Sequence, residues 1–330
     1  MKLLVLGAGD VRRLLAWDEC ADAMRHALAA LARGQVHQPL RMIIRPPGAA
    51  GMMALMPAYQ AAPEPEAAYG LKAICIFPGN PAAGLDSHQG VVLLSSAQTG
   101  EPLALLNASA VTEVRTAAVS AVATELLARA DATELAIIGT GVQARAHLLA
   151  IAAARRLTRV RVAGRDQDKA RQFADQMRER VPAPVTACGS AADAVAAAGI
   201  VVTATSSAEP VLCRDWLAPG AHINAVGACV PQARELDTET MAAAALFTDS
   251  RESATSEAGD YLLARADGVI GPEHIRAEIG EILTGGAPGR TSDTEITVFE
   301  SLGLAAEDLA AAALAHRKAA ELGAGSWVEF

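Results

Sequence analysis

Between residues 133 and 250, the apolar positions form short β-branched runs separated by Ala-rich stretches with helical spacing. An apolar run at 135–138 ends on Gly139-Thr140-Gly141, and an Ala- and Leu-rich stretch at 142–157 precedes a second run at 160–163. This pattern predicts strand, glycine turn, helix and strand within the length of one βαβ unit. The alternation then repeats, with helices predicted at 166–180 and 191–198 and strands at 185–187, 199–205, 220–226 and 245–248. We therefore predict a parallel sheet whose last strand is 245–248.

Residues 40–106 follow a different pattern, in which apolar and polar positions partly alternate and Gly, Pro and Asn turns separate the runs. They predict a meander of strands, preceded by an edge strand or arm at 1–6 and a helix that Asp18 caps. A helix at 108–129 leads into the parallel sheet. The tail at 292–322 is predicted to form a turn and a long helix that packs back on the N-terminal part.

The predicted fold is of the α/β class. A Rossmann-type doubly wound parallel sheet is expected at 119–299, with a second α+β domain at 1–118 and 300–330.

The glycine turn predicts dinucleotide binding. Gly139 permits the tight turn, Gly141 lets the backbone approach a pyrophosphate, and Ala144 allows close packing of the helix on the strand. The N-terminus of the following helix offers free N–H groups to the phosphates. A purely structural glycine turn is the alternative.

The end of the second strand bears on the choice of dinucleotide. Gly164 leaves room for a 2′-phosphate and Arg165 supplies a guanidinium, which favours NADP(H) over NAD(H). Asp166 would reverse this preference if its side chain, instead of Arg165, pointed at the ribose.

Composition narrows the choice of partners and compartment. The 330 residues carry a net charge of -9 and only 3% aromatic residues, which argues against nucleic acid and anionic membrane surfaces as partners. The five cysteines are scattered without a paired motif, so neither a disulfide framework nor a metal site is indicated. Without a signal peptide or a membrane-length apolar run, the expected location is the cytoplasm.

Several motifs, in this order, resemble the ornithine cyclodeaminase/mu-crystallin family over nearly the whole chain. They are GLKAICIFPGNPAAGLDSHQG, TGEPLALLNASAVTEVRTAAVSAVAT, IIGTGVQARAH, PGAHINAVGA and ITVFESLGLAAEDLAAA. The resemblance implies a homodimer whose N-terminal domain provides the subunit contact and much of the substrate site, beside a Rossmann domain that carries NAD(P).

The resemblance also assigns site residues. Arg41, Lys72 and Arg115 match substrate-contacting cations, which suits an α-carboxylate and, for Lys72, proton transfer at an imine nitrogen. Thr297 and Val298 match a stretch near nicotinamide and substrate. The positions that match cofactor contacts are Ser87, His88, Arg115, Thr116, Gly139, Gly141, Val142, Gln143, Gly164, Arg165, Asp166, Thr205, Ser206 and Val226.

Two residues depart from the cyclodeaminase branch. Cys229 stands where that branch places an Asp thought to shuttle protons, and Ala54 stands where it tends to carry Glu. Cys229 is a candidate catalytic residue by position, although a thiol without a nearby base is expected to be inert.

The sequence thus predicts an NADPH-dependent reductase of a ketimine or cyclic imino acid, such as pyrroline- or piperideine-2-carboxylate. Arg41 and Arg115 would hold the carboxylate, while Lys72 or a water that it orients would manage the proton. Ornithine cyclodeaminase, an alanine dehydrogenase-like enzyme and an NADPH-binding protein without turnover remain alternatives.

Overall fold

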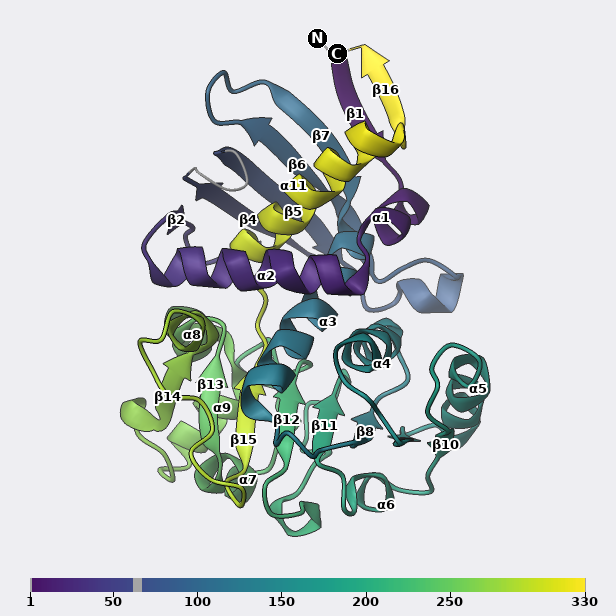
Figure 1. Ribbon diagram of the computed structural model, residues 1–330, viewed down its shortest axis with the longest axis vertical. Coiled ribbons are helices and arrows are strands. Elements are labelled where there is room, and N and C mark those ends of the chain that lie inside the picture. The colour runs from purple at the N-terminus through teal and green to yellow at the C-terminus, as the bar shows by residue number, and fades with distance from the viewer. Residues whose placement is uncertain (1, 62–66, 330) are drawn as a thin grey trace. The chain divides into compact units, whose positions relative to one another are not determined.

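The computed structural model describes residues 2–61 and 67–329, and the chain divides into two compact units. The first unit contains the residues up to Arg115 and those from Gly303 onward, and the second contains Thr116–Leu302. Helix α3 (Ala108–Leu127) begins in the first unit and ends in the second. Both ends of the chain, purple and yellow in Figure 1, thus belong to the first unit.

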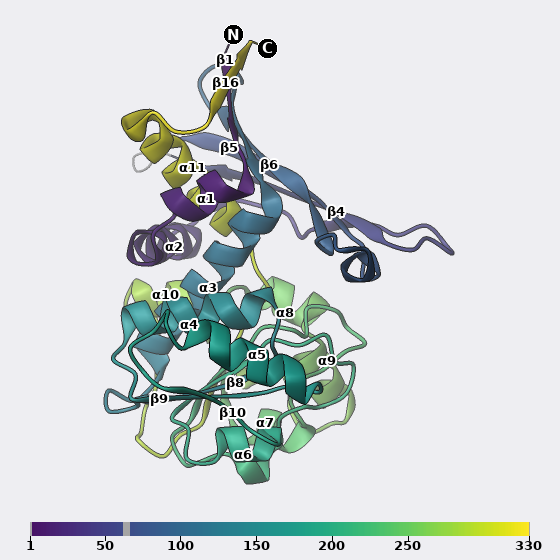
Figure 2. The same ribbon diagram turned by 90° about the vertical axis from the view of Figure 1, so that its right-hand side faces the viewer.

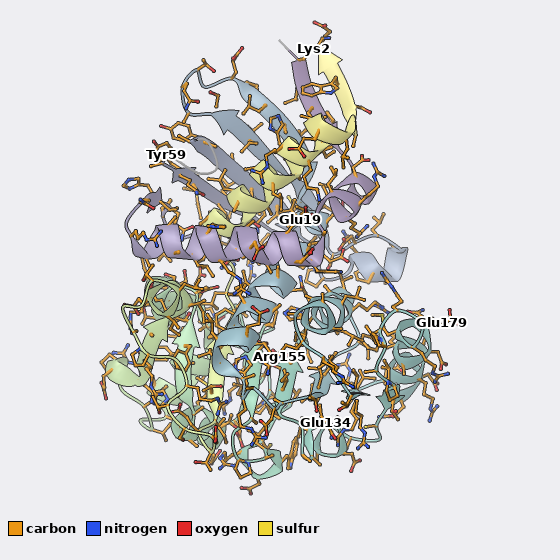
Figure 3. All side chains as sticks on the ribbon, in the orientation of Figure 1. Lys2, Glu19, Tyr59, Glu134, Arg155 and Glu179 are labelled. Carbon is orange, nitrogen blue, oxygen red and sulfur yellow. The ribbon has the colours of Figure 1, made fainter. Side chains whose placement is uncertain are left out.

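The first unit is built on a mostly antiparallel sheet in which the two ends of the chain pair. The strand order is β16-β1-β7-β6-β5-β4-β2, with β3 beside β4. The strands are β1 (Lys2–Leu6), β2 (Val36–His37), β3 (Met42–Ile44), β4 (Met52–Gln60), β5 (Ala68–Ile76), β6 (His88–Ser96), β7 (Pro102–Asn107) and β16 (Ser326–Glu329). Lys2, labelled in Figure 3, pairs with Glu329. The predicted edge position of residues 1–6 is wrong, because β16 covers that side of β1.

Three helices of this unit are α1 (Ala8–Leu14), α2 (Trp17–Ala32) and α11 (Ala305–Leu322), and a 3-10 turn, η1, spans Asn80–Ala83. Helix α11 lies across β4, β5 and β6 and packs beside α2, as Figure 2 shows. This confirms the predicted packing of the tail helix. Helix α2 starts after Ala16, so Asp18 lies in its first turn instead of capping it.

Large apolar side chains are exposed on β3 and on the sheet face that α11 leaves uncovered. Met42, Ile43, Met53 and Tyr69 are among them. A hollow of about 360 Å³ on this face is lined by residues that include Tyr59, which Figure 3 labels, and Tyr69. The first unit thus has one covered and one apolar, exposed sheet face.

The second unit holds an eight-stranded sheet in which every pairing is parallel, in the order β10-β9-β8-β11-β12-β15-β13-β14. The strands are β8 (Glu134–Ile138), β9 (Arg159–Ala163), β10 (Val185–Ala187), β11 (Ile200–Thr203), β12 (His222–Ala225), β13 (Ala245–Thr248), β14 (Ile275–Glu278) and β15 (Thr297–Glu300). The order reverses between β8 and β11, so a topological switch point lies there. The predicted doubly wound sheet is confirmed.

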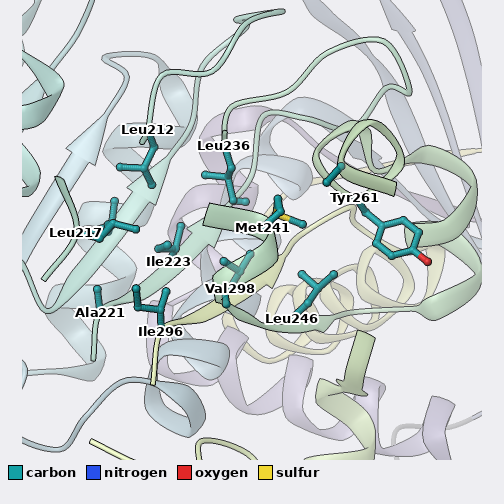
Figure 4. Close-up of a cluster of buried hydrophobic side chains, with 14 of the residues drawn as sticks. Leu212, Leu217, Ala221, Ile223, Leu236, Met241, Leu246, Tyr261, Ile296 and Val298 are labelled. Atoms are coloured by element: carbon teal, nitrogen blue, oxygen red, sulfur yellow. The ribbon is translucent and has the colours of Figure 1, made fainter. Parts of the chain in front are cut away.

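Helices cover both faces of this sheet, because successive side chains of β8 point to opposite faces and both sets are apolar. Leu135 and Ile137 pack with α4 and α5, whereas Ala136 and Ile138 belong to the opposite core, part of which Figure 4 shows. The helices are α4 (Val142–Ala154), α5 (Gln167–Met177), α6 (Ala191–Val195), α7 (Thr238–Ala243), α8 (Arg251–Glu257), α9 (Gly259–Ala266) and α10 (Ile279–Leu283), with 3-10 turns η2 (Arg214–Trp216) and η3 (Pro272–His274).

The prediction that 245–248 closes the sheet is wrong. Strand β14 lies beyond it, and β15 inserts between β12 and β13. The segment that forms β15 is predicted as a turn. It contains only three apolar or β-branched residues in a row, and so short a run cannot be distinguished from a loop by its periodicity.

Candidate functional site

The glycine turn has the geometry of a dinucleotide-binding loop. Gly139 follows β8 with a φ of 126°, and a Cβ there would collide with the carbonyl oxygen of Ala204. Gly141 is the N-cap of α4, with open space where its Cβ would lie. Ala144 is fully buried against β8, while Val142 stays exposed at the helix start. Gln143, the next predicted contact, follows Val142 in the first turn of α4.

The segment after β9 contains two predicted ribose contacts, Arg165 and Asp166, in different environments. The Asp166 carboxylate accepts N–H bonds from Asp168 at 3.0 Å and Lys169 at 3.1 Å, so it caps α5. Arg165 is exposed, and a Cβ on Gly164 would lie 3.0 Å from Thr140 Cγ2. Asp166 thus caps α5, and the exposed Arg165 directly precedes it.

The carboxyl ends of β11 and β12 lead into the loops with the other predicted cofactor contacts. Thr205 and Ser206 follow β11, and Val226 follows β12. Ligands of such sheets bind outside the carboxyl ends of the strands. The thiol of Cys229 lies at this edge, with Sγ 3.4 Å from the Val226 carbonyl oxygen and 3.6 Å from that of Ser301.

The first unit contains a buried cluster of opposite charges. Lys72 Nζ lies 2.6 Å from Asp308 Oδ2 and 3.5 Å from Thr112 Oγ1. Arg115 donates from Nε to Asp308 Oδ1 at 2.9 Å and from Nη1 to Glu307 Oε2 at 2.8 Å. Asp308 thus bridges the two cations, and all four side chains are at most 5% exposed. We call Arg41, Lys72, Arg115, Glu307 and Asp308 the cation cluster.

The cluster sets the charge state of Lys72. Burial lowers the pKa of Lys72, Asp308 opposes this shift, and the positive charges of Arg115 and Arg41 add to it, so that the pKa is about 8. The pKa of Asp308 is lowered, because Arg115 and Lys72 outweigh its own burial. Lys72 can therefore exchange a proton near neutral pH.

Arg41 joins the cluster through Gly303. Its Nη2 donates to the Gly303 carbonyl oxygen at 3.0 Å. Gly303 has a φ of 78°, and a Cβ there would overlap the Arg115 guanidinium. The structure thus brings together Arg41, Lys72 and Arg115, the three cations that the resemblance matches to substrate contacts.

Two predicted cofactor contacts, Ser87 and His88, lie at the start of β6. Ser87 Oγ is 3.0 Å from His88 Nδ1, and burial lowers the pKa of the imidazole. Ser109 donates to the backbone carbonyl of His88. Thr116, another predicted contact, is buried on α3. These geometries leave the predicted cofactor role of all three residues untested.

The structure places Thr297 and Val298, the predicted substrate contacts on this stretch, at the start of β15. Both are fully buried at the amino end of β15, opposite the carboxyl edge where ligands bind. Thr297 Oγ1 lies 3.0 Å from His222 Nδ1 and accepts from Arg290, and Val298 packs in a hydrophobic core. The matching motif continues past β15 to Gly303, and it is that later part which reaches the cation cluster.

Glu307 and Asp308 are the site residues that the sequence interpretation missed. Acidic residues in the first turn of a helix normally stabilise its N-terminus from the solvent side. Here they are buried. An available signal was their position in AAEDLAAAAL (305–314), where the other eight residues are Ala or Leu, since an Ala-rich face with a carboxylate pair needs cations nearby.

Comparisons with known proteins agree with this geometry. A sequence profile of the ornithine cyclodeaminase/mu-crystallin family matches residues 1–322. The chain belongs to this family. The mouse ketimine reductase mu-crystallin is 41% identical over 293 residues, which are 88% of each protein.

Two solved structures of relatives superimpose closely. One is Δ1-pyrroline-2-carboxylate reductase from Thermococcus litoralis in complex with NADH and L-proline, with a TM-score of 0.94 and 37% identity over 98% of this chain and 99% of the other. The other is an archaeal alanine dehydrogenase dimer with bound NAD, with a TM-score of 0.93 and 32% identity over all of both chains.

Within the family, the structure locates the two departures from the cyclodeaminase branch. Ala54 is buried on β4 and lies on the same sheet face as Lys72, which pairs with Met56 two residues further on. Cys229 lies at the carboxyl edge of the parallel sheet. Neither position carries a carboxylate.

Among the helices of the described residues, none combines the length and apolar character that a membrane span requires.

Proposed function

We propose that this protein reduces a cyclic imino acid or ketimine that carries an α-carboxylate, using NAD(P)H. The observation that carries the proposal is the buried Lys72, which is ion-paired with Asp308 and lies close enough to Arg115 and Arg41 to feel their charges. The relatives named as ketimine reductase and as pyrroline-2-carboxylate reductase support the same reaction class.

Different residues of the chain would bind the carboxylate, donate the proton and bind the cofactor. Arg41 and Arg115 provide guanidinium groups for the carboxylate, which orients the C=N bond. Lys72, as an ammonium, donates a proton to the imine nitrogen, and Asp308 keeps that ammonium charged. Gly139, Gly141 and the N-terminus of α4 fit the pyrophosphate of a nicotinamide dinucleotide, which supplies the hydride.

We further propose that NADPH is preferred to NADH. The supporting geometry is the exposed Arg165 beside Gly164, together with the use of the Asp166 carboxylate as a helix cap. A capping carboxylate accepts backbone N–H bonds and is less available to a ribose hydroxyl.

We also propose that two copies of the chain pair through the exposed apolar face of the first unit. Monomers seldom leave such contiguous apolar surface in water. The dimeric alanine dehydrogenase relative supports this assembly. The cytoplasmic location expected from the sequence stays a prediction.

The experiment that tests the reaction follows reduced-nicotinamide absorbance with purified protein. Substrates are Δ1-pyrroline-2-carboxylate, Δ1-piperideine-2-carboxylate and pyruvate with methylamine, each with NADPH and with NADH. Consumption of NADPH with one of these substrates is expected. Ammonia release from ornithine without net cofactor consumption would instead indicate a cyclodeaminase, and cofactor binding without turnover on the whole panel would indicate a binding protein.

A further inference from the structure

The carboxylate of Glu235 joins two loops at the carboxyl edge of the parallel sheet. Its Oε1 accepts the backbone N–H of Thr205 at 2.6 Å, in the loop after β11. Its Oε2 accepts the backbone N–H of Gly227 at 2.7 Å, in the loop after β12. The residue is fully buried, so one side chain fixes the ends of two neighbouring strands relative to each other.

The backbone of Glu235 is itself held on both sides. Asp260 Oδ1, on α9, accepts the N–H groups of Glu235 and Leu236, each at 2.8 Å. The Glu235 carbonyl oxygen accepts the N–H groups of Val211 at 2.7 Å and Leu212 at 3.0 Å. The backbone of Glu235 is therefore held in place, so its carboxylate can fix the distance between the loops after β11 and β12.

The space around Gly227 is shaped for this contact. A Cβ on Gly227 would lie 2.6 Å from Glu235 Cδ and would collide with the Thr205 carbonyl oxygen. The backbone after β12 can approach the carboxylate only because Gly227 has no side chain. Gly227, the Glu235 carboxylate and the Thr205 backbone thus pack closely against one another; we call this contact the Glu235 joint.

We propose that Glu235 is a positioning residue, which sets the separation of the two loops that would flank the nicotinamide end of the cofactor. The role rests on the proposed function, since Thr205, Ser206 and Val226 contact a cofactor only if one binds. Glu235 touches neither substrate nor cofactor in this role. It acts through the backbone of Thr205 and Gly227, and a shift of about 1 Å at such a site can change a rate by a factor of about a hundred.

The decisive variant is Glu235→Gln. Its amide has one acceptor oxygen and one NH2 group, so either Thr205 or Gly227 would face a donor instead of an acceptor. We expect single-turnover hydride transfer to slow by about tenfold to a hundredfold, with an increased primary isotope effect from 4-deuterated NADPH. Affinity for 2′-phospho-ADP-ribose, which lacks nicotinamide, should stay within about twofold, because its proposed contacts are in the turns after β8 and β9.

Glu209→Gln is the matched control, because Glu209 lies in the same loop as Thr205 with its side chain exposed. It should leave both measurements unchanged. If Glu235→Gln fails to fold, Glu235→Asp keeps the charge but is one methylene too short to reach both loops, and the same pattern is expected.

Two results would overturn the role of Glu235. Wild-type hydride transfer in both variants would show that the joint is dispensable, and an equal loss of transfer and of 2′-phospho-ADP-ribose binding would show a general structural role. A wild-type protein that binds neither NADPH nor NADH would overturn the proposed function as well, which separates the two failures.

Discussion

Lys72 is the residue whose environment departs furthest from that of an ordinary surface lysine. It is buried, ion-paired with Asp308 and close enough to two arginines for their charges to lower its pKa. A lysine with a pKa of about 8 is charged at neutral pH and yet can release its proton. At the residue scale, this combination is the chemical centre of the first unit.

Replacing Lys72 by Met should abolish most turnover while leaving cofactor binding intact. Methionine has a similar volume and no proton to give, so we expect kcat to fall by about a hundredfold or more. Steady-state kinetics and a fluorescence titration with NADPH would measure the two effects. Lys2→Met, at an exposed lysine, is the control; equal turnover in the two variants would rule out Lys72 as the acid.

The pH dependence of turnover should report on Lys72. Reduction needs the ammonium, so kcat should fall as pH rises through about 8, where the amine replaces it. Asp308 raises the pKa of Lys72, and Asp308→Asn should therefore move this fall to lower pH. Rate profiles for both proteins between pH 6 and pH 10 would test the shift; an unmoved or upward-moved limb would contradict the pairing.

Arg165 should set the choice of nicotinamide cofactor. The change Arg165→Gln removes the charge that we propose contacts a 2′-phosphate and keeps a polar side chain. We expect the ratio of kcat/KM for NADPH to that for NADH to fall by about tenfold, the effect of one charge-assisted contact. An unchanged ratio would remove the basis for the NADPH preference.

At the scale of elements, local signals predicted structure well where glycines mark the boundaries. The turn Gly139-Thr140-Gly141 separates β8 from α4 in the structure as in the prediction. The sequence analysis did not predict strands β14, β15 and β16, because they are short and because their partner strands lie elsewhere in the chain. Glu307 and Asp308 escaped because burial of a helix N-terminus depends on the packing of α11 on the sheet.

The cap of α5 offers a test of the structural role of Asp166. The change Asp166→Ala removes the acceptor for the Asp168 and Lys169 N–H groups and should lower the free energy of unfolding by about 1 kcal/mol. The ratio of NADPH to NADH efficiency should stay near that of the wild type. Denaturant unfolding and cofactor kinetics measure the two effects; stability unchanged with an altered ratio would place Asp166 at the ribose instead.

At the scale of the whole molecule, the exposed apolar face of the first unit bears on assembly. The change Ile43→Asp puts a charge on a side chain that is 47% exposed, and it should convert the proposed dimer into monomers. Light scattering after gel filtration measures the mass. Leu322→Asp, at an exposed position of α11, should keep the dimer; a wild-type monomer would refute this assembly.

The charges of the cation cluster predict that substrate binding changes the number of protons bound to the protein. Its five members comprise three cations and two carboxylates when Lys72 is charged, and a substrate carboxylate adds a third negative charge. That charge must raise the pKa of Lys72, because an opposite charge favours the ammonium. Above about pH 8, substrate binding should therefore take up part of a proton from the buffer. Titration calorimetry of a carboxylate without an amine, such as cyclopentanecarboxylate, in two buffers with different heats of ionisation, would count that proton.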